Sequence, residues 1–314
     1  MYAVCFFFVP MLQRLNEALH MAYGIKHIAA IAQSFVFYGM NMIGENNYLK
    51  TAERAAREAG AILLHHLGDL REIETINDNP LNLVTEADRN AEKRIVELLL
   101  EAYPDHAILG EESGAHEGAA PYRWIIDPLD GTTNYTHDFP IFSVSIALEH
   151  EGRIEVGVVY DPVRDEMFSA ERGKGASLNG DRIHVSEEDE IGRSMLVTGF
   201  PYNIHDNPDH CYERFIGFLS EAQAIRRLGS AALDCAYVAA GRLDGFWEVA
   251  LQPWDKAAGQ LLIEEAGGKI TNFEGEEHDI YALPLLASNG RIHDQMVRVL
   301  ADAKLISITI TPRS

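Results

Sequence analysis

The stretch WIIDPLDGTTN, residues 124–134, decides how the rest of the chain is interpreted. Its three leading apolar residues predict a short buried strand that ends at Asp127. The proline that follows turns the chain, and Asp130 comes three residues after Asp127. Gly131 permits a close backbone approach, and Thr132-Thr133 is a suitable start for a helix. The stretch therefore predicts a strand, a turn with two carboxylates, and a helix.

Such a unit brings together groups that bind a metal and a phosphate. The N–H groups at a helix N-terminus lack intrahelical acceptors and favour an anion. Carboxylates beside them offer the oxygen ligands that Mg²⁺ prefers, and Mg²⁺ commonly bridges to a substrate phosphate. Asp127-Pro128 alone is usually no more than a turn, so this interpretation depends on further acidic segments.

Two other segments place acidic groups at turn-like positions. One is Gly110-Glu111-Glu112-Ser113, and the other is Trp254-Asp255. Taken separately, the first is typical of a solvated loop and the second of a helix N-cap. Because all three segments occur in this order in one chain, we expect a single acidic site built from them.

Composition is that of a folded protein with a large excess of acidic groups. The 314 residues are 47% hydrophobic and 24% charged, and the formal net charge is −22. This charge argues against broad nucleic-acid binding, because the electrostatic term would be repulsive. It leaves surplus carboxylates for hard cations. Three cysteines without metal-site or disulfide spacing indicate a reducing compartment.

Hydrophobic periodicity predicts helices packed on a largely antiparallel sheet in the first half of the chain. Helices are expected over residues 48–67 and from Thr85 to about residue 102, the second with a capping-like start. Strands are expected over residues 142–148 and 154–160, and Asn179-Gly180 predicts a hairpin.

The second half alternates between the two patterns and predicts an α/β arrangement. Strands are expected near residues 195–199, 224–227, 244–248 and 285–288, and helices near residues 208–221, 230–241, 255–266 and 292–303. The acidic run at 187–190 is interpreted as a linker. The predicted division is an N-terminal extension outside the fold (1–45), an α+β subdomain (46–186) and an α/β subdomain (187–314).

The N-terminal extension has two interpretations. Residues 1–10 and 28–42 are apolar, but both stretches are shorter than the about 18 residues that a transmembrane helix needs. A basic start typical of a signal peptide is also missing. We favour a poorly structured extension before a start at Met40 or Met42 over a cryptic signal or membrane anchor. We expect a cytoplasmic protein without membrane association.

Taken together, the motifs resemble the inositol monophosphatase family of Mg²⁺-dependent, lithium-sensitive phosphatases. The resemblance covers about residues 48–303 and not the extension. It implies an α/β fold of α+β layers, an alternating αβαβα sandwich, and commonly a homodimer. The matching stretches are NLVTEAD (82–88), GEES (110–113), WIIDPLDGTTN (124–134), FPIFSVSIAL (139–148), GSAA (229–232), WDKAAG (254–259) and EAGG (265–268).

The resemblance also implies the roles of individual residues, with two to three Mg²⁺ ions in each site. The first subdomain would be the metal-binding one. Glu111, Asp127 and the Leu129 carbonyl would hold one ion, and Asp127, Asp130 and Asp255 a second. A third, weaker ion would lean on Glu111. Thr132 paired with Asp88 would orient and deprotonate the attacking water, with Glu111 as a further catalytic residue. Substrate contacts would come from Leu129, Asp130, Gly131, Thr132, Gly229, Ser230, Ala231, Glu248 and Asp255.

Two positions bear on these roles. Glu248 follows an apolar pair six residues before Trp254, so it could reach the mouth of the site. The alternative for Glu248 is an exposed carboxylate at a strand end. Asn77 stands where many members of the family carry Lys, which puts in doubt any ion pair that the family forms there.

The resemblance implies a phosphomonoesterase that converts myo-inositol monophosphate to myo-inositol and phosphate. A metal-activated water would attack phosphorus in line, without a phospho-enzyme. Fructose-1,6-bisphosphatase, 3′-phosphoadenosine-5′-phosphate phosphatase and histidinol phosphatase are alternatives with the same metal site. A nucleotide would require an aromatic- or Arg-lined pocket, which we do not locate in the sequence.

Two further interpretations lie outside this chemistry. The pair Arg226-Arg227 is interpreted as a dimer or salt-bridge pair rather than a catalytic one. An interaction protein in a regulatory complex is the alternative function of a different class.

Overall fold

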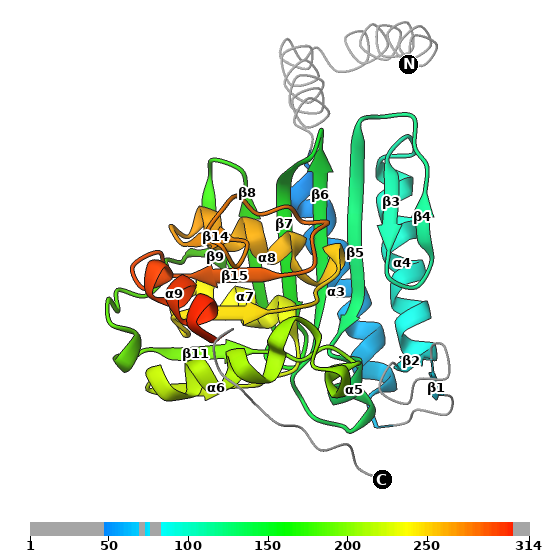
Figure 1. Cartoon of the computed structure of the whole chain (residues 1–314). Coiled ribbons are helices and arrows are strands. Elements are labelled where there is room, and N and C mark those ends of the chain that lie inside the picture. The colour runs from blue at the N-terminus through cyan, green and yellow to red at the C-terminus, as the bar shows by residue number, and fades with distance from the viewer. Residues whose placement is uncertain (1–46, 69–72, 76–82, 304–314) are drawn as a thin grey trace, which may run out of the picture. The chain divides into compact units, whose positions relative to one another are not determined.

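The structure is a computed structural model that describes residues 47–68, 73–75 and 83–303 (Figure 1). The backbone alone is described for residues 73–75, 83 and 84. The two interpretations of the N-terminal extension, and the position of Asn77, lie outside these ranges. Within them, no helix combines the length and the apolar character needed to cross a bilayer.

An eight-stranded sheet lies in the first half of the chain, with the strand order β10-β9-β8-β7-β6-β5-β3-β4. Only the β3–β5 pair of this sheet is parallel, so the expected antiparallel arrangement is confirmed. Its strands are β3 (Ala107–Gly110), β4 (Gly114–His116), β5 (Tyr122–Asp130), β6 (Ser143–His150), β7 (Arg153–Asp161), β8 (Glu166–Glu171), β9 (Gly175–Leu178) and β10 (Asp181–Arg182). A separate antiparallel pair joins β1 (Ile73–Thr75) to β2 (Leu83–Thr85).

A mixed five-stranded sheet forms the second half, with the order β12-β11-β13-β15-β14. Strands β12, β11 and β13 run parallel, whereas β13, β15 and β14 pair antiparallel. Helical crossovers between parallel neighbours account for the predicted α/β alternation. The bounds are β11 (Met195–Thr198), β12 (Ala224–Arg226), β13 (Gly245–Glu248), β14 (Lys269–Thr271) and β15 (Leu285–Ser288).

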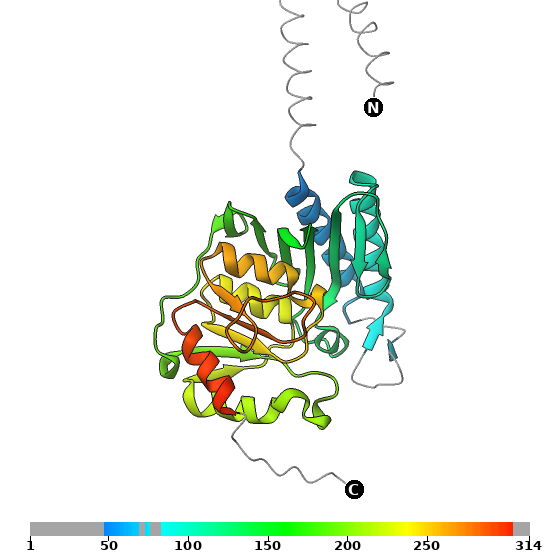
Figure 2. The same cartoon turned by 45° about the horizontal axis from the view of Figure 1, so that its top comes forward.

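Three helix layers enclose the two sheets, as Figures 1 and 2 show. Helices α3 and α4 pack on the outer face of the large sheet, α7 and α8 lie between the sheets, and α6 and α9 pack together on the outer face of the small sheet. The predicted αβαβα sandwich is confirmed. The helices are α3 (Tyr48–His66), α4 (Glu86–Ala102), α5 (Thr132–Thr136), α6 (Cys211–Glu221), α7 (Ala231–Ala239), α8 (Pro253–Glu265) and α9 (His293–Ala303).

Small side chains explain how the outer helix α3 approaches the large sheet so closely. Its buried stripe consists mainly of alanines, and a Cβ on Gly60 would lie 2.6 Å from the Tyr160 ring. The alternation of the central strands divides their side chains between two cores. Ile126 of β5 faces α3 and α4, whereas Ile125 faces α7 and α8.

The prediction that the strand ends at Asp127 is wrong. Strand β5 continues to Asp130 through an irregularity in its pairing with β6. Asp127 pairs with Ser145 and Asp130 with Ser143, so three steps on β5 match two on β6. This β-bulge accommodates Pro128, which has no N–H to donate to a regular ladder. The bulge re-aims the end of the strand and thereby sets the directions of the two aspartates.

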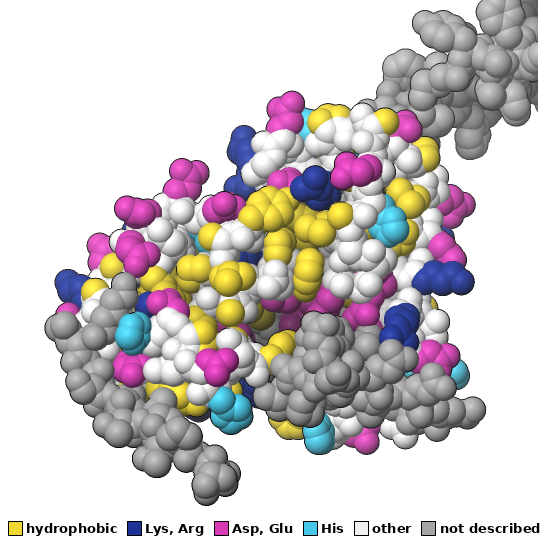
Figure 3. All heavy atoms as spheres, turned by 45° about the vertical axis from the view of Figure 1, so that its right-hand side comes forward, with side chains coloured by type: hydrophobic (Ala, Val, Ile, Leu, Met, Phe, Trp, Pro, Cys, Tyr) yellow, Lys and Arg dark blue, Asp and Glu magenta, His cyan; other side chains and the backbone are white. Residues whose placement is uncertain are grey.

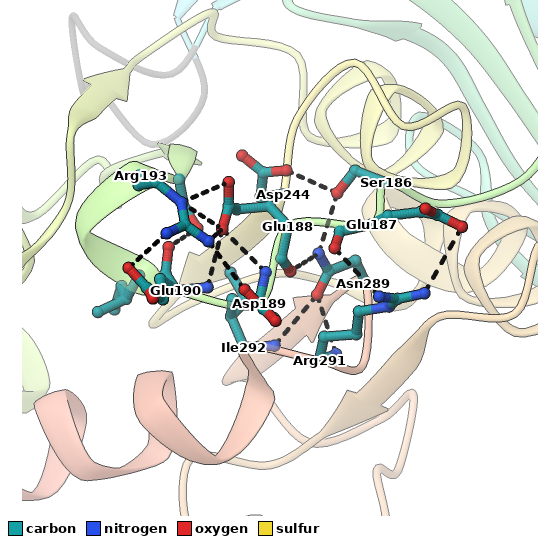
Figure 4. Close-up of polar contacts among 12 residues, drawn as sticks. Ser186, Glu187, Glu188, Asp189, Glu190, Arg193, Asp244, Asn289, Arg291 and Ile292 are labelled. Carbon is teal, nitrogen blue, oxygen red and sulfur yellow. Dashed lines mark hydrogen bonds and ion pairs between the residues drawn. The ribbon is translucent and has the colours of Figure 1, made fainter.

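The acidic run 187–190 lies between the last strand of the first sheet and the first strand of the second, where a linker was expected, and hydrogen bonds and ion pairs hold it in place (Figure 4). The Glu188 carboxylate accepts hydrogen bonds from the N–H groups of Asp189 and Glu190, both at 2.9 Å. Arg193 pairs with all three of these acidic residues. Asn289, just after β15, donates to the Glu188 carbonyl at 2.7 Å. The Arg193 guanidinium and the Asn289 side-chain amide therefore hold the segment in place.

Candidate active site

The bulge of β5 and the short helix α5 form the centre of the site. Gly131 joins them with φ +102°, and an added Cβ would lie 3.1 Å from the carbonyl oxygens of both Gly229 and Ile141. Glycine is therefore required at this position on two grounds, conformation and space. Asn134 of α5 donates to the Ile141 and Leu228 carbonyls, each at 2.8 Å, which fixes the 228–229 turn against α5.

Asp130 joins the two halves of the compact unit. Its carboxylate accepts hydrogen bonds from the Ser230 hydroxyl at 2.5 Å and from the N–H groups of Ala231 and Ala232 at 3.1 and 2.8 Å. These groups begin helix α7, so the carboxylate lies at the positive end of that helix. The N–H of Ala231, a residue that the family resemblance assigns to substrate binding, is thus already paired within the protein.

Glu111 belongs to the turn between β3 and β4, which a buried carboxylate of α4 holds. Glu92 accepts the N–H of Glu112 at 2.9 Å and that of Ser113 at 2.7 Å. A Cβ on Gly110 would lie 2.7 Å from Glu92 Oε2, which explains the glycine of the GEES motif. Sequence analysis missed Glu92, although it shares a face of α4 with Asp88 at a spacing of four residues.

Asp255 lies at the start of α8, with Gln252 as the N-cap residue. One carboxylate oxygen, Oδ2, accepts the Gln252 N–H at 2.7 Å. The N-cap alternative is therefore wrong in position, because Gln252 is the N-cap and Asp255 completes the capping box as the third helical residue. This contact does not exclude a second role, because no hydrogen bond from the described residues reaches the other oxygen.

Four carboxyl groups from these segments lie close enough to affect one another's ionisation. Burial raises the pKa of Glu111 and Asp127 well above the ordinary value, and neighbouring carboxylates raise both further. Burial is also the main cause of the raised pKa of Asp130. Burial raises the pKa of Asp255 to about 7, with a further contribution from Asp130. Each group would ionise more easily if a cation were among them.

Thr132 and Asp88 form the pair that sequence analysis expects. The Thr132 hydroxyl lies 3.4 Å from Asp88 Oδ1 and 3.1 Å from the Leu129 carbonyl, and it can donate to either. The Thr85 N–H donates to Asp88 Oδ2 at 2.8 Å as part of a capping box of α4. Burial raises the pKa of Asp88 to about 6.

A cavity of about 710 Å³ collects most of the predicted residues. Its volume falls within the range of about 300–1,000 Å³ typical of ligand pockets. On the face shown in Figure 3, acidic side chains gather in a hollow beside hydrophobic ones. The predicted residues that line the cavity are Glu111, Asp130, Gly131, Thr132, Gly229, Ser230, Ala231, Glu248 and Asp255.

Glu248 is buried at the end of β13 and lines the cavity, so the exposed-carboxylate alternative is wrong. Burial raises its pKa to about 8. A Cβ on Gly199 would lie 2.1 Å from Glu248 Oε2, so the backbone of the 199–203 loop packs directly on this carboxyl. By contrast, Asp88, Asp127 and Leu129 lie behind the cavity wall.

Comparison with known proteins gives the same assignment as the geometry. The sequence profile described as "Inositol monophosphatase family" matches residues 45–305. The chain belongs to the inositol monophosphatase family. A relative in Pseudomonas aeruginosa, "Nus factor SuhB", is 48% identical over 77% of this chain and 91% of its own length.

Solved structures of the family are also similar. Inositol monophosphatase from Anabaena matches with a TM-score of 0.74 and 44% identity, over 81% of this chain and 95% of that one. The extragenic suppressor protein suhB from Bartonella henselae matches with a TM-score of 0.77 and 41% identity, over 81% and 98%.

The carboxyl cluster fits the Mg²⁺ that the inositol monophosphatase family implies. As they stand in the described ranges, no three His, Cys, Asp or Glu side chains converge closely enough to hold an ion. Nevertheless, the Glu111 and Asp127 carboxyls lie within hydrogen-bonding reach of each other. Two carboxylates can share such a position only with a proton or a cation between them. Oxygen-only donors of this kind suit Mg²⁺.

Asp234, Tyr202 and Arg227 are among the residues of the cavity wall that were not singled out as site residues in the sequence. Asp234 in the first turn of α7 is buried, Tyr202 is 47% exposed, and Arg227 follows β12. Among the described residues, neither Arg226 nor Arg227 forms an ion pair, so the salt-bridge interpretation is not supported, whereas the dimer interpretation remains a prediction. Only Arg227 lines the cavity.

Proposed function

We propose that this member of the family is a Mg²⁺-dependent phosphomonoesterase that hydrolyses myo-inositol monophosphate. The observation that carries the proposal is the grouping of four mutually interacting carboxyls, three of which line the same cavity as Gly131, Thr132 and Glu248. Phosphoryl transfer needs positive charge next to the phosphate oxygens. An acidic cavity can meet that need only with bound cations.

Glu111, Asp127, Asp130, Asp255 and the Leu129 carbonyl are the groups that would hold Mg²⁺. Bound Mg²⁺ supplies Lewis-acid stabilisation of the charge on the attacking and leaving oxygens. The backbone N–H groups of Gly131 and Thr132 would bind the phosphate, because the first N–H groups of a helix lack intrahelical acceptors. The left-handed Gly131 turns the chain so that these N–H groups precede α5.

Thr132 and Asp88 would remove the proton of the attacking water. The water would pass a proton to the Thr132 hydroxyl, whose own proton would move to Asp88 Oδ1 at 3.4 Å. A pKa of about 6 suits Asp88 to this task near neutral pH, since an effective general base has a pKa close to the operating pH. No phospho-enzyme forms along this route.

Glu248 would accept hydrogen bonds from the hydroxyls of the polyol. Its carboxyl is buried in the cavity wall, so a substrate hydroxyl that reaches it would exchange hydrogen bonds with water for a hydrogen bond to a buried carboxyl. Toward the polyol, Asp130 would act mainly through the groups that it orients, because three of its four protein donors reach Oδ2; Oδ1, which accepts only the Ala231 N–H, is the oxygen that would face Mg²⁺.

A second candidate function comes from the relatives' names. Relatives in Pseudomonas, Salmonella and Escherichia that are 43–48% identical are called "Nus factor SuhB", which is not the name of a phosphatase. An interaction role on this fold therefore stands as the alternative. The homodimer that the family resemblance implies remains a prediction.

Phosphate release from four compounds tests the proposal, with Mg²⁺ present and then chelated. The compounds are inositol 1-phosphate, fructose 1,6-bisphosphate, 3′-phosphoadenosine 5′-phosphate and histidinol phosphate. We expect Mg²⁺-dependent release, fastest from inositol 1-phosphate. Faster release from another compound would agree with the proposed metal site but refute the assignment of Glu248 to the inositol ring. No release from any compound would favour the interaction role.

A further inference from the structure

Lys256 is a fully buried cation that the proposed chemistry does not use. It follows Asp255 on α8 and is 0% exposed, but it does not line the cavity. No carboxylate in the described part of the chain forms an ion pair with its ammonium group. Burying a charge without an ionic partner costs stability, and an apolar side chain of similar size often avoids that cost. Stability alone therefore does not explain a lysine at this position.

The ammonium group of Lys256 binds backbone carbonyls instead. It donates hydrogen bonds to the carbonyl of Ala282 and, at 3.5 Å, to that of Leu283. Both carbonyls belong to the segment 272–284, which connects β14 to β15. Tyr281 and Leu283 are 45% and 48% exposed, so this part of the connection runs over the surface. Lys256 therefore ties a surface segment to the buried side of α8.

A second contact ties the same segment to the large sheet. The Tyr281 hydroxyl donates a hydrogen bond to Glu149 of β6 at 2.8 Å and accepts one from Arg123 of β5 at 2.9 Å. Residues 281–283 are thus held at two points, by Lys256 on α8 and by the side chains of two strands.

The Leu283 carbonyl connects this segment to the proposed metal site. Besides the bond from Lys256, it accepts the Leu251 N–H at 3.0 Å. The next residue, Gln252, donates its N–H to Asp255 Oδ2 at 2.7 Å. Leu251, Gln252 and Asp255 all line the cavity. A closed set of contacts therefore leads from Lys256 through Leu283 back to the turn that begins α8.

We infer that Lys256 is a positioning residue of the proposed metal site, which fixes the turn 251–255 and thereby the direction of the Asp255 carboxylate. This inference rests on the proposed function, because it concerns the Mg²⁺ that Asp255 would help to hold. Removing a group that orients a metal ligand typically weakens metal binding about 10- to 100-fold. The positive charge of Lys256 acts in the opposite direction, since it repels a cation. We expect positioning to outweigh this repulsion, because the ammonium group lies against the 282–283 backbone and outside the cavity wall.

The test compares Lys256→Met with a matched control, Lys269→Met. Methionine is also unbranched, and it removes the charge and the hydrogen-bond donor. Lys269 of β14 is exposed, lies outside the cavity wall and pairs with Asp294 at 3.6 Å. The measured quantity is the Tm of the full chain without substrate, in chelator and at increasing Mg²⁺ concentrations. The rise of Tm with concentration gives the Kd of the ion.

We expect Lys256→Met to raise the Kd of Mg²⁺ about 10- to 100-fold. Lys269→Met should leave it within about twofold, as for most surface substitutions. A Lys256→Met variant that changes the Tm in chelator but keeps the wild-type Kd would show a purely structural role and overturn the inference. A lower Kd would show that charge repulsion dominates, and it would also overturn the inference.

Tyr281→Phe is the second variant, and it decides the matter if Lys256→Met does not fold. It removes only the hydroxyl that ties the segment to the large sheet, and it should raise the Kd about 3- to 10-fold. Because both side chains act through the same segment, the double variant should bind Mg²⁺ about as weakly as Lys256→Met alone. An unchanged Kd in Tyr281→Phe, or two effects that multiply in the double variant, would overturn the inference.

Phosphate release distinguishes this inference from the proposed function. Kd values that change as expected, in a protein that releases no phosphate from any compound, would sustain the inference and refute the proposed function. Mg²⁺-dependent release together with the wild-type Kd in both variants would do the reverse. A wild type whose Tm does not respond to Mg²⁺ would overturn both.

Discussion

Replacing Asp127 by Asn should separate the stability of the fold from its response to Mg²⁺. Asp127 is 1% exposed, and both burial and the neighbouring Glu111 raise its pKa. Asn has the same shape and retains an oxygen for the Leu129 N–H, which Asp127 accepts at 2.9 Å. The substitution therefore removes a charge and leaves the packing in place.

The sign of the effect follows from the raised pKa. A carboxyl whose pKa is higher in the folded than in the unfolded protein stabilises the fold only at low pH. That stability is lost as the pH rises from about 4 through its folded-state pKa. Each unit of the rise corresponds to about 1.4 kcal/mol. Without Mg²⁺ at pH 7, we therefore expect the free energy of unfolding of Asp127→Asn to be higher than that of the wild type.

With Mg²⁺ the order should reverse. An ion at 100 times its Kd stabilises the folded state by about 2.7 kcal/mol, equivalent to about 5–10 °C in Tm for a domain of this size. The wild type should show that rise and Asp127→Asn should not.

Calorimetry in chelator and in Mg²⁺ measures both effects, with Asp302→Asn on the exposed face of α9 as the control. An equal rise in Tm on adding Mg²⁺ to the wild type and to Asp127→Asn would refute the assignment of this carboxylate to the metal. A metal-free variant less stable than the wild type would refute the electrostatic argument.

Three further substitutions test the surroundings of the cluster. Asp88→Asn should lower kcat about 10²- to 10⁴-fold. In the wild type, protonation of Asp88 should reduce kcat/KM below about pH 6, and this acid limb should be absent from the pH profile of the variant. An acid limb that stays in place would exclude Asp88 as the base. Glu92→Gln should raise the Mg²⁺ concentration needed for half-maximal activity about 10- to 100-fold, because an amide cannot accept both N–H groups of the turn. Glu97→Gln, a change at an exposed residue, should leave this concentration unchanged, and equal values in the two variants would contradict the role of Glu92. Gly131→Ala should cost about 1–3 kcal/mol in urea unfolding and more than Gly152→Ala, whose added Cβ meets open space; equal costs would mean that space at position 131 is not limiting.

The local patterns of the sequence account for most of the fold and for the centre of the site. A buried strand, a proline turn and a glycine before a helix are all encoded within residues 124–134, so the two aspartates could be placed together. The periodicity of the long helices and central strands is likewise local. The short strands β4, β10 and β14 have only two or three residues each, which is too few for a periodic signal.

The residues that were missed act across the fold. Pro128 reads locally as a turn, and only the pairing of β5 with β6 makes it part of a bulge. In the sequence Asp234 resembles any polar residue of a helix, and only the tertiary structure shows that it is buried. Arg227 lies at the cavity because Asn134 fixes the turn that follows it. Glu92 alone had a usable signal, its position four residues after Asp88 on the same helix face.

The rate of phosphate release from inositol 1-phosphate, compared between the wild type and Asp127→Asn, tests the central claim most directly. We predict that chelation abolishes release by the wild type and that Mg²⁺ restores it. Asp127→Asn, shown to be folded by circular dichroism, should release no phosphate in either condition. Release that survives chelation, or an Asp127→Asn rate within about tenfold of the wild type, would contradict catalysis by cations held in this carboxyl cluster.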